Sequence, residues 1–109
     1  MYKRILVPTD GSDLSFAAIQ AATRLAKSLS AEIVAINVMP KLGQMAFPDY
    51  GAYEMVSEEV FNKETEEEAR NILAVAEEEA ASSKVPCTVV TRRDAEPFRA
   101  IIDAASEYK

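Results

Sequence analysis

The chain contains no histidine and only one cysteine, Cys87, among its 109 residues. Histidine is the side chain that most often acts as a general base or binds a metal near neutral pH. A lone cysteine cannot form a disulfide within the chain, and a buried thiol is its ordinary role. The composition therefore favours a binding protein over an enzyme.

Long apolar runs are also absent. The first short run, Ile5–Val7, is followed directly by Pro8, Thr9 and Asp10, which leaves it too short for the core of a signal peptide. No stretch approaches the roughly 20 apolar residues that cross a bilayer. We therefore expect a cytoplasmic protein that is not integral to a membrane.

Basic residues are outnumbered: 12 Lys and Arg stand against 18 Asp and Glu, and the formal net charge is −6. Such a charge repels nucleic acid and anionic lipid. The basic residues do not cluster, since Lys3–Arg4 and Arg92–Arg93 are the only adjacent pairs. We therefore expect neither nucleic acid nor a membrane as a partner.

What the chain does contain is enough apolar material for one core, with 49% hydrophobic residues, so we expect one domain over residues 1–109. Continuous apolar runs, typical of strands covered on both faces, predict strands at 2–7, 32–39 and 85–91. Helical spacing of apolar residues predicts helices at 14–29, at 54–83 and after residue 94. This β-α-β-α-β-α order predicts an α/β fold with a parallel sheet whose crossovers are right-handed.

The sequence also predicts where the helices begin and which side chains they bury. Ser12 or Asp13 is expected to cap the first helix and Asp94 the last, because these side chains accept bonds from backbone N–H groups. The glutamate runs 66–68 and 77–79 are expected at the surface rather than on a metal. The predicted inner faces are Ala18, Ala22, Leu25, Ala26 and Leu29; Val56, Val60, Ile72, Leu73, Ala76 and Ala80; and Phe98, Ile101, Ile102 and Ala105.

A loop at Pro40–Tyr53, rich in glycine, proline and aromatic residues, follows the second predicted strand. Loops of this length are often mobile or functional, and the sequence does not decide between these two. Methionines between Met39 and Met55 are expected in the core, although a partner-binding surface is the alternative.

Several short motifs follow one another along the chain. Residues 2–12 read YKRILVPTDGS, residues 25–27 read LAK and lead into AEI at 31–33, and NV follows at 37–38. Residues 94–97 then read DAEP, and 101–105 read IIDAA. Along its whole length the chain resembles the universal stress protein family. The resemblance implies an adenine nucleotide alpha hydrolase-like fold, a three-layer open parallel sheet of strand order 3-2-1-4-5, of which these residues supply the β-α-β-α-β-α part.

The resemblance also implies a ligand and its contacts. In similar proteins Pro8, Thr9 and Asp10 would contact adenosine, with Asp10 near the ribose or base, and Val38 would receive the adenine edge through its backbone. This implies a stress-response protein that binds ATP or AMP, with Mg²⁺ expected only as the companion of ATP. Any hydrolysis in such a protein is slow, and no catalytic residue is expected.

The chain departs from the family in its glycines. Nucleotide-binding members carry a pattern of Gly, two residues, Gly, nine residues, Gly and Ser or Thr, whose backbone N–H groups cradle phosphates. Gly11, Gly43 and Gly51 do not form it. The family's fourth and fifth strands would follow Lys109, so we expect weak ATP binding. Without them the first strand becomes a sheet edge, and we expect a homodimer or higher oligomer.

Three alternatives remain. The alternative to a nucleotide-binding protein is a module of the same family that binds no nucleotide and works through a dimer or a protein partner. Asp10 could be only a helix or turn cap. Residues 9–12 also imitate half of the haloacid-dehalogenase signature, but Pro8 occupies the nucleophile position and carries no carboxylate, which argues against a phosphatase. A smaller departure is Ser30, where many relatives have glycine at the end of the helix.

Overall fold

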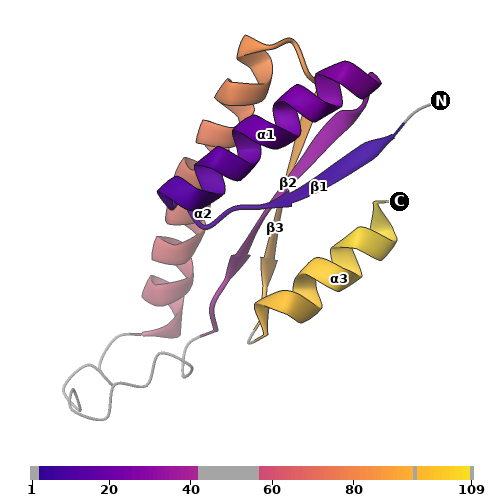
Figure 1. Ribbon diagram of the computed structural model, residues 1–109. Helices are drawn as coiled ribbons and strands as arrows, with labels where there is room; N and C mark the ends of the chain where they lie inside the picture. Colours follow the sequence, from indigo (N-terminus) through magenta and orange to yellow (C-terminus); the bar gives the residue numbers. More distant parts are fainter. Residues whose placement is uncertain (1–2, 42–56, 95, 109) are drawn as a thin grey trace.

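The computed structural model describes residues 3–41, 57–94 and 96–108 and confirms the predicted order of elements (Figure 1). The strands are β1 (Arg4–Pro8), β2 (Glu32–Met39) and β3 (Cys87–Arg93), and the helices are α1 (Asp13–Leu29), α2 (Glu58–Ser82) and α3 (Pro97–Glu107). The strands form a parallel sheet of order β1-β2-β3, with β2 in the middle. Residues 42–53 of the long loop and Val56 lie outside the described residues, so the predictions for them stay untested.

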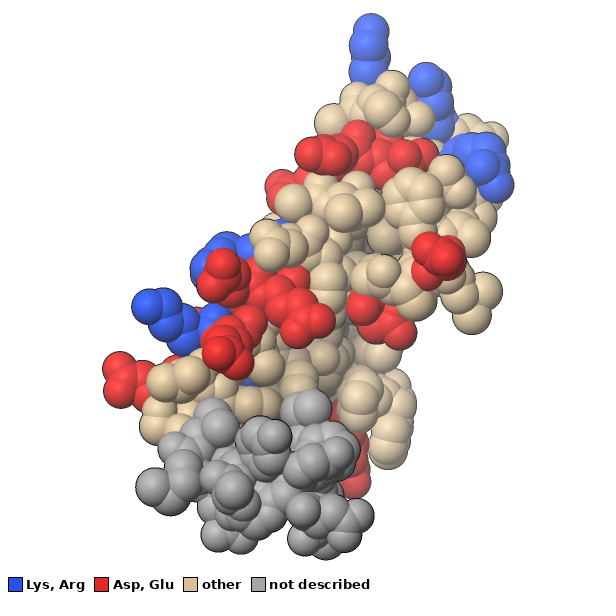
Figure 2. Space-filling model, turned by 90° about the vertical axis from the view of Figure 1, so that its left-hand side faces the viewer, with Lys and Arg blue, Asp and Glu red and all other residues tan. Residues whose placement is uncertain are grey.

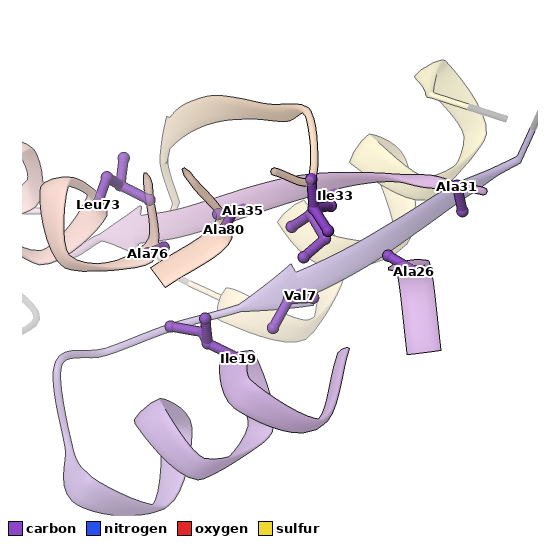
Figure 3. Close-up of a cluster of buried hydrophobic side chains, with 10 residues drawn as sticks. Val7, Ile19, Ala26, Ala31, Ile33, Ala35, Leu73, Ala76 and Ala80 are labelled. Carbon is purple, nitrogen blue, oxygen red and sulfur yellow. The ribbon is translucent and has the colours of Figure 1, made fainter. Parts of the chain in front are cut away.

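The middle strand explains the continuous apolar run in the sequence. Ile33 and Ala35 face one side of the sheet and belong to a core cluster with Val7 of β1 and residues of α1 and α2 (Figure 3). Val34 and Ile36 face the other side and pack with Val90 and with Ala104 of α3. Burying a side chain of this size stabilises the fold by about 1.5–3 kcal/mol. Helices α1 and α2 therefore cover one face and α3 the other, as right-handed crossovers require.

The buried helix faces agree with the prediction only in part: Ala26 of α1 and Leu73, Ala76 and Ala80 of α2 are buried as predicted, and the other positions differ. In α3, Phe98 and Ile102 are 64% and 61% exposed, whereas the residues that contact the sheet are Ala100 and Ala104. In α1 the buried residues are Ile19, Thr23 and Ala26, while Leu25 and Leu29 face outward together with Ala18. In α2 the buried set is Ala69, Leu73, Ala76 and Ala80, and Val60 is exposed. In α3 the small residues let the helix lie close to the sheet, and helical spacing alone does not tell a small inner face from a larger outer one.

The helix caps confirm one prediction and correct another. Ser12 is the N-cap of α1, and its hydroxyl accepts from the N–H of Ser15 at 3.1 Å. Asp94 does not cap α3, whose N-cap is Glu96 without a side-chain bond. Instead, Asp94 Oδ1 accepts from the N–H of Glu96 at 2.9 Å, because Pro97 takes the first helical position and moves the start of the helix two residues on.

The charged surface agrees with the prediction for the glutamate runs. Five of the six side chains at 66–68 and 77–79 are exposed, and Glu79 is half-buried. Figure 2 shows acidic side chains spread along this side of the molecule, with some basic side chains among them and others gathered at the top of the view. Within the described residues no three acidic or cysteine side chains are grouped as a metal would need, and none of the described helices is long and apolar enough to cross a membrane.

Candidate functional site

The exit of β1 is bonded to β2 by two hydrogen bonds. The N–H of Thr9 donates to the carbonyl of Ile36 at 2.9 Å, and Asn37 Nδ2 donates to the carbonyl of Thr9, also at 2.9 Å. Thr9 and Asn37 are 6% and 7% exposed. A buried amide bond of this kind fixes the position of the loop, since breaking it would leave a polar group without a partner. Sequence reasoning gave Asn37 no role, although it is the only polar side chain within the apolar run 33–39 of β2.

The turn after β1 is built from short polar side chains. The hydroxyls of Thr9 and Ser15 lie 3.1 Å apart, which connects the strand exit to the first turn of α1. Gly11 follows in a left-handed conformation, with φ of +84°. An added Cβ at Gly11 would lie 3.0 Å from Cγ1 of Ile72 in α2. The turn is therefore shaped by a glycine that both its backbone and its neighbour require.

Asp10 lies exposed at the top of this turn. Its Oδ1 accepts from the N–H of Ser12 at 2.9 Å, so the interpretation of Asp10 as a turn-holding residue is confirmed. Hydrogen bonds from the Ser12 side chain and backbone lower the pKa of Asp10 below its ordinary value. Asp10 is thus a carboxylate at neutral pH, placed in solvent at the carboxyl end of a parallel strand. Ligands of open α/β sheets bind at this end.

Val38 lies beside this exit on the neighbouring strand. Pro8 is in register with Ile36, so Val38 is two residues further along β2, about 6.6 Å beyond that pair. The side chain of Val38 is half-buried and packs on the face of the sheet that α3 covers.

The alternation of hydrogen bonds along β2 shows which way the backbone N–H and C=O of Val38 point. Ile33 donates to Pro86 beside β3, whereas Ile36 accepts from Thr9 beside β1. In a parallel ladder alternate residues bond to opposite neighbours, so the N–H and C=O of Val38 turn toward the β1 side. At Val38, however, β1 has already ended, because the last paired residues of the two strands are Pro8 and Ile36. The structure therefore brings Pro8, Thr9, Asp10 and the backbone of Val38 to one corner of the sheet.

A pocket of about 200 Å³ lies near this corner but on the other face of the sheet. Thr9, Ser12, Ser15 and Phe16 line it from one side, and Asn71 and Ile72 of α2 from the other. Because the side chain of Val38 faces α3, this pocket does not unite Thr9 with Val38. It is shallow and mostly apolar, and it is not the place that the sequence predicted for adenosine.

The arginines at the end of β3 hold protein elements together. Arg93 donates to the carbonyls of Pro40 at 2.8 Å and Asn62 at 3.3 Å, which ties the end of β2 to α2. Arg92 pairs with Glu107 of α3 at 2.8 Å, and this bond raises the pKa of Arg92. These bonds explain the adjacent arginines structurally. Cys87 is half-buried, and burial raises the pKa of its thiol, as an unreactive cysteine requires.

Comparison with known proteins agrees with this architecture. A model of the universal stress protein family matches residues 1–109. A universal stress protein of Methanocaldococcus jannaschii is 37% identical over 78 residues, which are 72% of this chain and 45% of that protein. The chain thus spans less than half the length of that curated relative.

Solved structures share the fold at lower identity. A universal stress family protein from Burkholderia pseudomallei is 23% identical with a TM-score of 0.76, and the match covers 97% of this chain and 74% of that one. A universal stress protein solved in complex with cAMP is 20% identical with a TM-score of 0.68, and the match covers 96% and 69% of the two chains. At this identity the likeness shows the fold.

Proposed function

The chain belongs to the universal stress protein family, and we propose that its β1 exit and the backbone of Val38 contact the adenosine part of an adenine nucleotide, ATP or AMP. The observation that carries the proposal is the corner itself. Asp10, whose pKa is lowered, follows the end of β1, and the backbone of Val38 turns toward β1 beyond the last paired residue of the two strands. The neighbour solved with cAMP adds support, since it shares this fold and binds an adenine nucleotide.

The chemistry of the corner suits adenosine. Ribose hydroxyls are donors, and a carboxylate is the strongest acceptor that a protein offers them, with charge-assisted bonds contributing about 1.5–3 kcal/mol each. The N–H of Val38 matches the N1 acceptor of adenine, and its C=O matches the N6 amino donor. Pro8 restricts the backbone just before the turn, because its ring fixes φ.

The phosphates find less support in these residues. The glycine pattern that cradles phosphates is absent from the 109 residues, and both arginines at the end of β3 are engaged with protein groups. We therefore propose weak binding that depends on the nucleoside, in which ATP and AMP have similar affinities and Mg²⁺ contributes only through its complex with ATP. The proposed activity is binding rather than turnover, in the cytoplasm and in response to stress.

The test is a titration of the 109-residue chain with adenosine, AMP and ATP up to about 10 mM, followed by two-dimensional NMR. We expect shifts at Asp10, Gly11 and Val38 with dissociation constants that agree within about threefold for the three ligands. Asp10→Asn should weaken binding at least tenfold, because it removes a charge-assisted bond worth at least about 1.4 kcal/mol. Asp13→Asn, an exposed carboxylate three residues on, is the matched control and should bind as the native chain does.

Two results would contradict the proposal: no shift at 10 mM ligand, or ATP binding that exceeds adenosine binding a hundredfold. The first would favour the second candidate, a family module that binds no nucleotide and acts through protein contacts. The exposed apolar side chains of α1 and α3 favour that candidate independently, since exposed apolar patches mark association surfaces.

A further inference from the structure

Helices α1 and α2 lie side by side on one face of the sheet (Figure 1), and the pocket of about 200 Å³ opens between them beside the exit of β1. Gly11, Ser12 and Ser15, which line it from one side, are all small, so little side-chain volume fills the space toward α2. The proposed nucleotide corner leaves this pocket unused, because the side chain of Val38 faces α3.

The walls of the pocket are apolar. Ile19 lies deepest and is 1% exposed, Phe16 and Ile72 are half-buried, and Val75 at the mouth is 45% exposed. A molecule in the pocket would cover the exposed parts of these side chains, and removing apolar surface from water is favourable. A cavity of about 150 Å³ with walls of leucine, isoleucine and phenylalanine is large enough to bind benzene. The volume here therefore has room for one aromatic ring with a small substituent.

One polar side chain of the pocket is available to a ligand. The hydroxyls of the turn are engaged within it: those of Thr9 and Ser15 lie 3.1 Å apart, and Ser15 donates to the carbonyl of Ser12 at 3.0 Å. The side-chain amide of Asn71, in contrast, has no hydrogen-bond partner among the residues that the structure describes. An amide both donates and accepts, as a hydroxyl group does. The pocket therefore suits a ligand whose ring carries a hydroxyl group.

The charge of the surroundings restricts the ligand further. None of the described residues that line the pocket is charged, and the chain as a whole has a formal net charge of −6. An anionic ligand would lose hydration without gaining a charged partner, and the field of the protein would repel it. The ligand that fits is neutral.

We propose that the pocket between α1 and α2 is a second binding site, which takes a neutral molecule of one aromatic ring with a hydroxyl group, as in a phenol. The ring lies against Phe16, Ile19 and Ile72, and the hydroxyl group bonds to the amide of Asn71. Because the pocket opens to solvent and offers one polar partner, we expect a dissociation constant of about 1–10 mM for phenol itself. The site lies on the other face of the sheet from the nucleotide corner, so either proposal can fail without the other.

A titration of the 109-residue chain with phenol up to about 20 mM, followed by NMR of the methyl groups, tests the proposal. We expect shifts at Ile19, Ile72 and Val75 and none at Val38, whose side chain packs on the opposite face. Benzoate, which carries a charge on a ring of the same size, should bind at least tenfold more weakly. The absence of shifts at 20 mM phenol, shifts that are strongest at Val38, or equal binding of benzoate would overturn the proposal.

Variants at the mouth of the pocket locate the ligand. Val75→Phe should weaken phenol binding at least tenfold, because its larger side chain occupies the space that the ligand needs. Ala74→Phe is the matched control, since Ala74 is an exposed neighbour on α2 that does not line the pocket, and it should bind phenol as the native chain does. Both positions are exposed, so both variants should keep the circular dichroism spectrum and the unfolding midpoint of the native chain. Unchanged phenol binding by Val75→Phe would overturn the site.

The role of the amide is tested separately. Asn71→Ala should weaken phenol binding about three- to tenfold and leave the binding of benzene, which has no hydroxyl group, unchanged. Asn71 is exposed, so this variant should fold as the native chain does. Equal losses for phenol and benzene would overturn the assigned bond between the hydroxyl group and Asn71.

Discussion

Replacing Gly11 by alanine tests how the exit of β1 is built. Gly11 has φ of +84°, where a side chain other than hydrogen costs about 1–2 kcal/mol. The new Cβ would also lie 3.0 Å from Cγ1 of Ile72, so Ile72 must move by a few tenths of an ångström. Ile72 is only half-buried and can yield, which limits this second cost to about 1 kcal/mol. We expect Gly11→Ala to destabilise the chain by about 2 kcal/mol in total.

Urea unfolding followed by circular dichroism measures this loss, and a double-mutant cycle divides it. Ile72→Ala removes Cγ1 and both methyl groups, so in that background Gly11→Ala should cost only the backbone part, about 1–2 kcal/mol. At about 4–8 °C per kcal/mol, the single variant should also melt about 8–16 °C lower than the native chain. If Gly11→Ala unfolds at the native urea midpoint with an unchanged slope, the positive φ does not hold in solution and the described turn is wrong.

Three further predictions concern the same corner and the end of α1. Ser30 lies in the left-handed region at φ of 55°, so Ser30→Gly should raise the unfolding free energy of the chain by about 1 kcal/mol. Ser28→Gly, within the helix, should lower it by about 0.5–1 kcal/mol. Thermal melting compares the two variants, and equal shifts in melting temperature would contradict the reasoning. Asn37→Ala removes the donor to the carbonyl of Thr9 and should cost about 1–3 kcal/mol in urea unfolding while weakening AMP binding; an unchanged midpoint would show that the bond is replaced. The folded pKa of Asp10 is lowered, so its stabilisation is present above its unfolded pKa of about 3.9 and is lost as pH falls through the lower folded value. Asp10→Asn should therefore flatten the stability profile below about pH 4, and a profile with an unchanged slope there would contradict the reasoning.

Much of the fold could be predicted because it is recorded locally. The apolar run of β2 marked a strand covered on both faces, and Ser12 marked the start of α1 by the chemistry of its hydroxyl. Ser30 stands where many relatives have glycine at the end of the helix, and the structure shows it in a left-handed conformation. The hydrogen bond that Asp10 makes within the turn could also be predicted, because a short acidic side chain can accept from the backbone N–H two residues away without any help from the rest of the molecule.

Other features could not be predicted, because they depend on distances between segments that are far apart in the chain. The predicted stripe of α3 with Phe98 and Ile102 was wrong, since whether a helix buries its large or its small face depends on how closely it approaches the sheet. Asn37 gained its role only when β1 ended opposite it. The pairing of Arg93 with Pro40 and Asn62 likewise joins residues more than 30 positions apart.

The sequence by itself determined the order of the elements, the parallel strands and the chemistry of the step from Pro8 to Asp10, because these follow from propensity, spacing and the handedness of crossovers. The tertiary structure alone decided which side of each helix is buried. It buried alanines against the sheet and left leucines in solvent on α1. It also aimed the backbone of Val38 past the end of β1. Such outcomes depend on register and on the distance between layers, and neither is encoded in any single segment.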